Sequence, residues 1–404
     1  MVVYFASRDL VPLYSIYALL FSDRGLSLAQ VSWLFVIWSL TAFVFEVPSG
    51  AWADAVDRRT LLVLSAGVYA LAFSCWMVVP TFSGFATGFV LWGLSSAMMS
   101  GTFESLLYDE LDDLGAASHF AQLYGWCQST AMVANLVGSV AAAPLFAVGG
   151  YALVGWTSVA MAGVQGLLAV SLPVAPRRPE RAGEDGVDAT EDVDNADLGL
   201  PASATFIDRY VSMLRVGLRE AVTSVDVRRV VIVSSVLVGL TAYDEYFALV
   251  GTHHGVPTAQ VAVLVGVAVV GQAIGTVLAG RTVGMTATTM GWAVAAGGTL
   301  ISAGVLMNPW VGFVAIGAGY GLLNNAMIVS EARLQESIVG VARATVTSVH
   351  GVATEVVALA VYALFALTAS TLSVPTVMAL LGLPVLVVAV GVRRWMPPAR
   401  YPST

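Results

Sequence analysis

Long apolar segments separated by short polar turns run along almost the whole chain. Each segment is long enough for a membrane-spanning helix, which needs about 20 mostly apolar residues. Irregular backbone cannot face lipid, so these segments are not loops. The pattern therefore predicts an all-α polytopic membrane protein with twelve transmembrane helices. The expected spans are residues 2–21, 29–50, 60–80, 83–108, 120–146, 151–173, 230–250, 258–280, 286–306, 310–333, 343–369 and 374–395.

A polar interval divides these spans into two sets of six. Between residues 174 and 204, Pro, Gly and acidic residues replace the apolar segments, which predicts a disordered acidic linker in the cytoplasm. Residues 205–229 place apolar residues and arginines at helical spacing, which predicts an amphipathic helix at the membrane surface with a basic face suited to anionic lipids. The predicted units are an N-terminal six-helix bundle (1–173), the linker (174–204), the interfacial helix (205–229), a C-terminal six-helix bundle (230–396) and a cytoplasmic tail (397–404).

Composition agrees with this class of protein. Hydrophobic residues make up 58% of the 404 residues and charged residues only 11%, far below the share of about 25% in soluble domains. The net charge of −8 lies largely in the linker, so it does not describe a substrate, and nucleic acid is not an expected partner. Cys75 and Cys127 lie within apolar segments, where we expect small buried side chains and not a disulfide or a metal site.

All 18 basic residues are arginines, and the chain has no lysine. Because guanidinium stays charged, any transported proton must move on carboxylates or histidines. Arginines are also unevenly distributed between the predicted loops. Only Arg24 lies on the side opposite the N-terminus, whereas the other side holds Arg58, Arg59 and Arg281 together with the linker and tail arginines. This asymmetry predicts a multi-pass protein of the inner (plasma) membrane with both termini in the cytoplasm.

A charged turn between the second and third spans has a recognisable pattern. Gly50, Asp54, Arg58 and Arg59 stand where the major facilitator superfamily carries Gly-x-Leu-Ala-Asp-Arg-x-Gly-Arg-Arg, and the chain resembles that family here. The resemblance implies two similar six-helix halves that rock about a central substrate site. It also implies that these residues, with Glu46 just before them, form a gate at the cytoplasmic face. Asp109, Glu110, Asp112 and Asp113 in the next cytoplasmic loop are either partners for the gate arginines or a solvated charge run.

Two further motifs of the family are only partly present. The loop between the eighth and ninth spans keeps Gly280 and Arg281 of the signature. The fifth span offers a partial match to the glycine-rich motif of drug antiporters, formed by Gly138, Pro144, Gly149 and Gly150. The chain therefore resembles the family as a whole more closely than it resembles the drug:proton antiporter type.

Ionisable residues inside spans indicate where function lies, because each costs at least about 2.5 kcal/mol on insertion scales unless it has a partner, water or a proton. Arg8 and Asp9 lie about 8 Å from the cytoplasmic end of the first span, and Glu104 lies at a similar depth in the fourth. The resemblance places the first, fourth, seventh and tenth spans around the central cavity, so Arg8 and Glu104 are expected to form either an ion pair within the half or part of the cavity.

The seventh span contains adjacent carboxylates, Asp244 and Glu245. Neighbouring side chains on a helix point about 100° apart, so we expect at least one of the two to face the cavity and not both to share one environment. Burial favours the neutral form of a carboxyl group, which makes this pair a candidate proton carrier. The alternative is that both lie hydrated in the outer vestibule.

Glu355 lies near the membrane centre in the eleventh span, where a bare carboxylate costs most, and is the strongest single candidate for protonation. His350 lies one to two turns below it. The alternative for Glu355 is a neutral side chain bonded to a neighbouring helix. Asn135 and Asn324 are candidates either for reading substrate polarity or for bonding helices together.

No cofactor, metal site or enzyme chemistry is expected. His253 and His254 lack carboxylate or cysteine neighbours and are interpreted as a polar turn, and the chain has no phosphate-binding Gly-Lys-Ser/Thr loop. The sequence favours a monomeric secondary transporter that uses alternating access and couples proton movement to efflux of a hydrophobic or amphipathic compound. Its partners would be a small-molecule substrate, protons and membrane lipids. The alternatives are a proton-linked or facilitative importer of a nutrient, and a receptor or lipid scramblase on the same fold.

Overall fold

The structure, a computed structural model, describes residues 1–173, 212, 224–337 and 343–398. Side chains of residues 46–55, 121, 226 and 343–345 are not part of this description. The predicted linker, most of the predicted interfacial helix and the last residues of the tail therefore lie outside the described residues. Every regular element among the described residues is a helix.

The N-terminal half begins with a broken rod and ends with a long bent helix. Its elements are α1 (Val2–Ser7), η1 (Pro12–Ser15), α2 (Tyr17–Asp23), α3 (Leu28–Ala55), α4 (Arg58–Val78), α5 (Phe82–Met99), α6 (Thr102–Asp113), η2 (Ala117–His119) and α7 (Phe120–Val170). The chain turns back on itself within α7, where Gly149 and Gly150 leave helical geometry and Gly150 has a φ of +57°. Glycine suits this turn because a positive φ is strained for other residues.

The C-terminal half repeats this plan, again with a broken first rod. Its elements are α9 (Val225–Leu240), η3 (Thr241–Tyr246), α10 (Phe247–His253), α11 (Thr258–Thr282), α12 (Ala287–Gly304), α13 (Pro309–Ser337), α14 (Arg343–Thr368) and α15 (Val374–Trp395). Residues 225–229, predicted to end the interfacial helix, instead belong to α9, because Ser224 caps that helix by accepting a hydrogen bond from the Val227 amide.

Among the described residues, nine helical stretches are long and apolar enough to cross a membrane. One of them, Ala117–Val170, contains both arms of α7. The broken rod of α1, η1 and α2 and the shorter helix α12 complete a set of helical rods that follows the predicted spans in order. The chain is thus an all-α polytopic membrane protein with two six-helix bundles, as predicted.

The fourth rod differs from the continuous span predicted at residues 83–108. It breaks at Ser100 and Gly101, where Gly101 has a φ of +71°, and α6 then continues to Asp113. Two glycines of this rod therefore have different functions. Gly93 lies against Thr41 and Ala42 of α3, so closely that an added Cβ would meet them at about 3 Å, whereas Gly101 makes the turn.

Backbones cross closely in the C-terminal half. A Cβ on Gly271 of α11 would lie 1.9 Å from the carbonyl oxygen of Gly317 on α13, and one on Gly275 would lie 2.1 Å from that of Gly321. No side chain fits between the two helices at these points. The packing is typical of membrane helices, in which small residues allow close approach.

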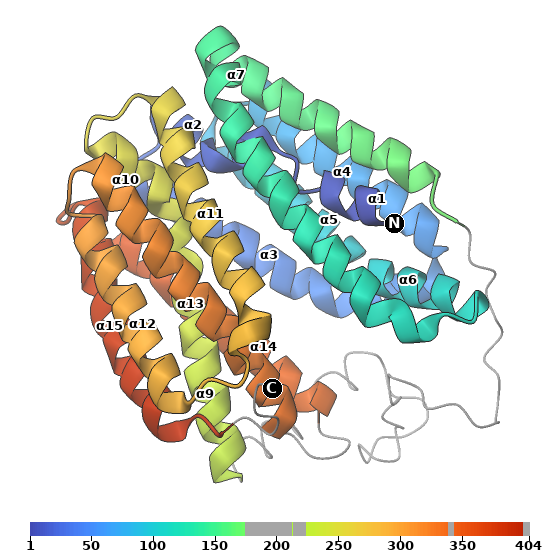
Figure 1. The fold of residues 1–404 in the computed structure, drawn as a ribbon. Helices are drawn as coiled ribbons and strands as arrows, with labels where there is room; N and C mark the ends of the chain where they lie inside the picture. Colours follow the sequence, from blue (N-terminus) through green and yellow to red (C-terminus); the bar gives the residue numbers. More distant parts are fainter. Residues whose placement is uncertain (174–211, 213–223, 338–342, 399–404) are drawn as a thin grey trace.

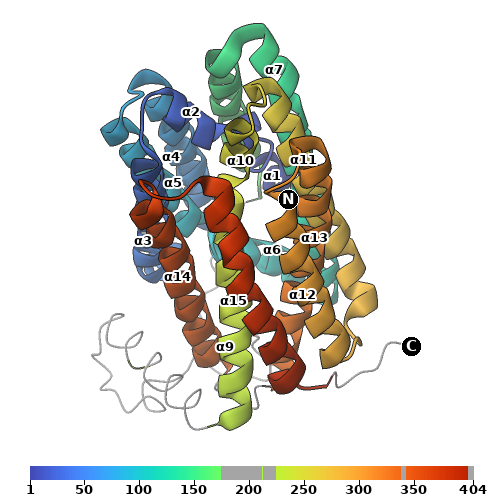
Figure 2. The same cartoon turned by 90° about the vertical axis from the view of Figure 1, so that its left-hand side faces the viewer.

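The two bundles have distinct ends. We call the end that carries the turn from α3 to α4 the signature end and the other the opposite end. Figure 1 shows α1 to α7 on one side and α9 to α15 on the other, diverging toward the signature end. Figure 2 shows α3 and α14 side by side, in agreement with their contacts.

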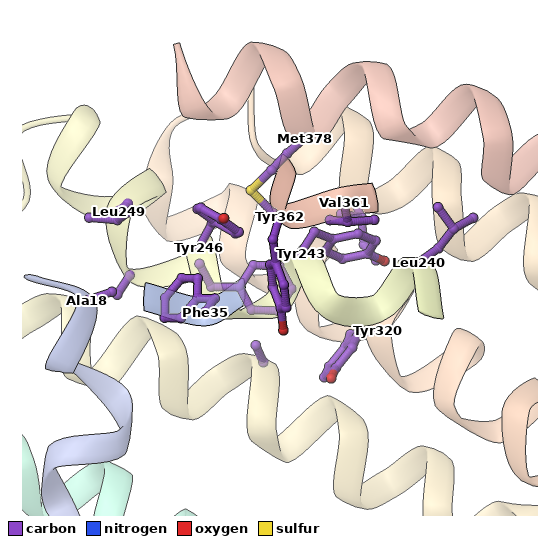
Figure 3. Packing of buried hydrophobic residues seen from close by; sticks show 14 of the residues in the cluster. Ala18, Phe35, Leu240, Tyr243, Tyr246, Leu249, Tyr320, Val361, Tyr362 and Met378 are labelled. Atoms are coloured by element: carbon purple, nitrogen blue, oxygen red, sulfur yellow. The ribbon is translucent and has the colours of Figure 1, made fainter. Parts of the chain in front are cut away.

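Aromatic side chains join the halves on the opposite-end side of the interface. Tyr246 of η3 donates a hydrogen bond of 2.8 Å to Ser32 on α3, and its ring stacks on Phe365 of α14 at 3.6 Å. Phe35 of α3 packs against Tyr246 and Tyr362 with ring centroids 5.4 and 5.5 Å apart (Figure 3). These residues lie between the middle of the bundle and its opposite end, so the structure is closed there.

Candidate substrate cavity

A cavity of about 360 Å³ lies between the two halves. Its volume falls within the range of about 300 to 1,000 Å³ that small-molecule sites occupy. Both halves line it, with residues from α1 to α7 facing residues from η3 to α13. The lining residues are Arg8, Asp9, Tyr14, Ser15, Tyr17, Trp38, Trp92, Ser96, Asn135, Ser139, Asp244, Glu245, Phe247, Val265, Ala268, Val269, Gln272 and Tyr320.

Breaks in two rods bring four charged side chains to this cavity. Arg8 and Asp9 follow the end of α1, and Asp244 and Glu245 lie in the short helix η3 that joins α9 to α10. Irregular backbone at membrane depth is tolerated where it lines a cavity and not where it meets lipid. The predicted intramembrane charges of the first and seventh spans thus lie in one site.

Arg8 is held within the N-terminal half by neutral groups. Its guanidinium donates hydrogen bonds to Ser96 Oγ at 2.9 Å and to Met99 Sδ at 3.0 Å, and lies 4.9 Å from the ring centre of Tyr69. The predicted pair with Glu104 is not formed. Glu104 lies beyond the break at Gly101 and accepts a 2.9 Å hydrogen bond from Tyr124 of α7, because the break separates α6 from the cavity-lining part of the rod.

Asp244 and Glu245 both line the cavity, so the expectation that they could not share one environment is wrong. The two carboxylates differ in their hydrogen-bond partners, which come from different halves. Tyr320 of α13 donates a 2.5 Å hydrogen bond to Asp244, and Tyr17 of α2 donates one to Glu245. Glu245 thereby connects the two halves.

Aromatic residues form much of the N-terminal wall and were not predicted as site residues. Tyr14 and Trp92 stack with ring centres 5.1 Å apart, and Trp38 lies 5.3 Å from Trp92. The indole N–H of Trp38 is buried and has no hydrogen-bond partner among the described residues. Tyr17 and Tyr320 hold the carboxylates of the other wall. The only signal in the sequence would have been their place in the same spans as the charged residues.

The predicted polar residues divide between the cavity and the helix contacts. Asn135 lines the cavity with Gln272. Asn324 is buried between α13 and α11, where its amide donates to the Gln272 carbonyl at 3.2 Å and to Thr276 Oγ1 at 2.6 Å. Asn324 therefore bonds helices together.

Glu355 and His350 lie on α14, outside the cavity lining. Glu355 accepts a hydrogen bond from Ser39 of α3, which makes it a second carboxylate that connects the halves. His350 is buried, and its Nε2 has no hydrogen-bond partner among the described residues. The structure thus brings Arg8, Asp9, Asp244, Glu245 and Asn135 together but keeps these two side chains apart from them.

The signature end shows one pair of the predicted gate. Arg58, at the start of α4, forms an ion pair with Asp109, so one of the predicted acidic residues supplies a partner for this arginine, as one of the two alternatives expected. The predicted loop is wrong, because Asp109 and the acidic residues after it belong to helix α6. Arg59 is partly buried beside it. The side chains of Glu46, Gly50 and Asp54 lie outside the described residues.

Arg333 stabilises the signature end of the C-terminal half through carbonyl groups. Its buried guanidinium donates to Pro397 O at 3.0 Å, to Val283 O at 3.3 Å and to Met285 O. It thereby joins α13 to the turn between α11 and α12 and to the segment after α15. The described residues include no group of three or more metal-ligating side chains, and His254 contacts the Val305 carbonyl at 2.9 Å.

A bundle of membrane-spanning helices with a charged cavity between its two halves is typical of a polytopic membrane transporter. Residues 1–354 match the family model of the Major Facilitator Superfamily, and the chain belongs to that family. No curated protein sequence matches it.

Several solved transporters share the fold. A bacterial homologue of the human lysosomal transporter Spinster, in an inward-facing and unoccupied conformation, superposes with a TM-score of 0.68 at 14% identity, with 97% of this chain and 94% of that chain covered. The nucleoside transporter NupG gives 0.68 at 12% identity over 96% of each chain. A bacterial homologue of the iron transporter ferroportin, in an inward-facing state, gives 0.66 at 13% identity over 97% and 96%.

Proposed function

We propose that the protein is a secondary active transporter that moves a small molecule by alternating access, as a monomer that crosses the plasma membrane twelve times with both termini in the cytoplasm. The observation that carries the proposal is the cavity, which both halves line and which contact between the halves closes at one end. Rocking of the halves would open that end and close the other. The signature end would then face the cytoplasm, and the structure would be the inward-facing state.

Proton coupling is proposed from the carboxylates. Glu245 and Glu355 each accept a hydrogen bond from the opposite half, so each contact must break when the halves separate at the opposite end. A proton can compensate a carboxylate that loses its partner in a low-dielectric site. The favoured cycle is proton-driven efflux of a hydrophobic or amphipathic compound, since aromatic rings form one wall of the cavity.

Reconstituted vesicles with an imposed pH gradient test this function. Candidate compounds come from a resistance and accumulation screen in a strain that lacks its own pumps. Wild-type protein should show proton movement that depends on the added compound, followed with a pH-sensitive dye in the lumen. Glu355→Gln and Glu245→Gln should abolish it, whereas Glu110→Gln on α6 should not. Proton movement that still depends on the added compound in both carboxylate variants would refute the assignment of these residues as proton carriers.

The other functions give different results in the same experiments. Uptake in cells that overexpress the protein would indicate the importer. The absence of movement for every solute, together with a single conformation in all conditions, would indicate a receptor or a lipid scramblase. The iron, nucleoside and peptide transporters of this fold belong to the similar structures, so the fold alone does not choose among substrates.

A further inference from the structure

The two walls of the cavity differ in charge. The N-terminal wall contributes one guanidinium, Arg8, and one carboxylate, Asp9, which are adjacent in the chain. The C-terminal wall contributes Asp244 and Glu245 and no cationic side chain. When all four groups are ionised, three carboxylates against one guanidinium leave two negative charges in excess, both on the C-terminal wall.

Arg8 does not neutralise that excess. Its guanidinium is directed to Ser96, Met99 and the ring of Tyr69 within its own half, and it forms no salt bridge with a described carboxylate. The hydroxyl groups of Tyr17 and Tyr320 hold Glu245 and Asp244 in place, but a neutral hydroxyl supplies no compensating charge. The carboxylates of the C-terminal wall therefore form no ion pair with a described cationic side chain.

The opposite wall is suited to an apolar or aromatic body. Tyr14, Trp92 and Trp38 present consecutive rings, and aromatic faces also attract a cation within about 6 Å. The cavity therefore has one charged wall and one aromatic wall, which suit different parts of a ligand.

We infer that the transported compound is an amphipathic organic cation, whose positive group binds at Asp244 and Glu245 and whose apolar body packs on Tyr14, Trp38 and Trp92. The inference rests on the proposed transport function, because it assigns the substrate class of the same cavity. An anion of the same shape would be repelled by the C-terminal wall, and a neutral compound would leave the two carboxylates without compensation.

A pair of probes with one shape and opposite charge tests the inference without any variant. Tetraphenylphosphonium and tetraphenylborate are such a pair, and radiolabelled probe bound to the full-length protein in detergent can be measured by equilibrium dialysis. We expect the cation to bind at least about tenfold more tightly than the anion, because truncation of buried charge pairs typically changes affinity by more than that. Equal binding, tighter binding of the anion, or no saturable binding of the cation would overturn the assignment.

Variants then locate the charge. Asp244→Asn with Glu245→Gln should reduce cation binding about tenfold or more and remove the selectivity, whereas Glu110→Gln on α6 should leave both unchanged. Size-exclusion profiles identify a variant that fails to fold, and for such a variant the wild-type comparison of the two probes decides. Selective cation binding by a protein that moves no solute in vesicles would refute transport and keep the cation site. Transport of a neutral solute without cation selectivity would refute the cation site and keep transport.

Discussion

The hydroxyl group of Tyr246 offers a direct test of the closed opposite end. It donates a 2.8 Å hydrogen bond across the interface to Ser32 Oγ, and the tyrosine is fully buried. Tyr246→Phe removes this bond and keeps the ring that stacks on Phe365. The Ser32 hydroxyl keeps its own 2.9 Å bond to the Leu28 carbonyl, so the substitution leaves no donor unpaired at Ser32.

The expected shift in the conformational equilibrium follows from the loss of this one hydrogen bond. A hydrogen bond of this kind contributes about 1 kcal/mol, which corresponds to a factor of about five in an equilibrium. The bond exists only while the halves touch at the opposite end. Its loss should therefore increase the population that is closed at the signature end about fivefold, relative to the population seen here.

Spin or fluorescence labels across the signature end measure this shift. Leu114 and Arg394 are exposed in the two halves and can be replaced by cysteine after Cys75 and Cys127 have been removed. We expect Tyr246→Phe to enrich the shorter distance. Tyr124→Phe is the matched control, because the Tyr124 hydroxyl donates to Glu104 within the N-terminal half. An unchanged distance distribution in Tyr246→Phe, or the same change in the control, would refute the reasoning.

Three substitutions and one control test the stability of the bundle in thermal melts. Gly271→Ala should destabilise it by about 1 to 3 kcal/mol, because the new methyl group meets the Gly317 backbone, whereas Gly163→Ala meets no atom within 4 Å and should not lower the midpoint. Arg333→Met should also lower the midpoint, by releasing the three carbonyls that the guanidinium binds. Arg58→Ala should change stability by less than about 1 kcal/mol because its ion pair is partly exposed, and a larger loss would indicate a stronger clasp.

The membrane-spanning helices were predictable from the sequence because a helix must be long and apolar to cross a membrane. The hydropathy pattern shows both properties directly. The breaks were not predictable from it. Gly101 looks like any small residue in a packed row, and only tertiary contacts decide that it adopts a positive φ. The short helix η3 was equally hidden within an apolar stretch, which is why the sequence did not predict that both Asp244 and Glu245 line the cavity.

The charged part of the site was predictable for an energetic reason. Arg8, Asp9, Asp244 and Glu245 are costly in lipid, so their presence in spans marks a cavity. Aromatic residues carry no such cost, and Trp38 therefore resembled any lipid-facing or core residue until the fold placed it in the cavity. The resemblance at the signature turn supplied the arrangement of the halves, which no single span encodes.

The glycine crossings of the C-terminal half affect how the molecule can move. Where Gly271 meets Gly317 and Gly275 meets Gly321, main chains touch with no side chain between them to change rotamer. Sliding of α11 along α13 would drive one backbone into the other. These two helices must therefore move together as one rigid body. Bending then occurs in the spans that are already interrupted, at η1, at Gly101 and at η3.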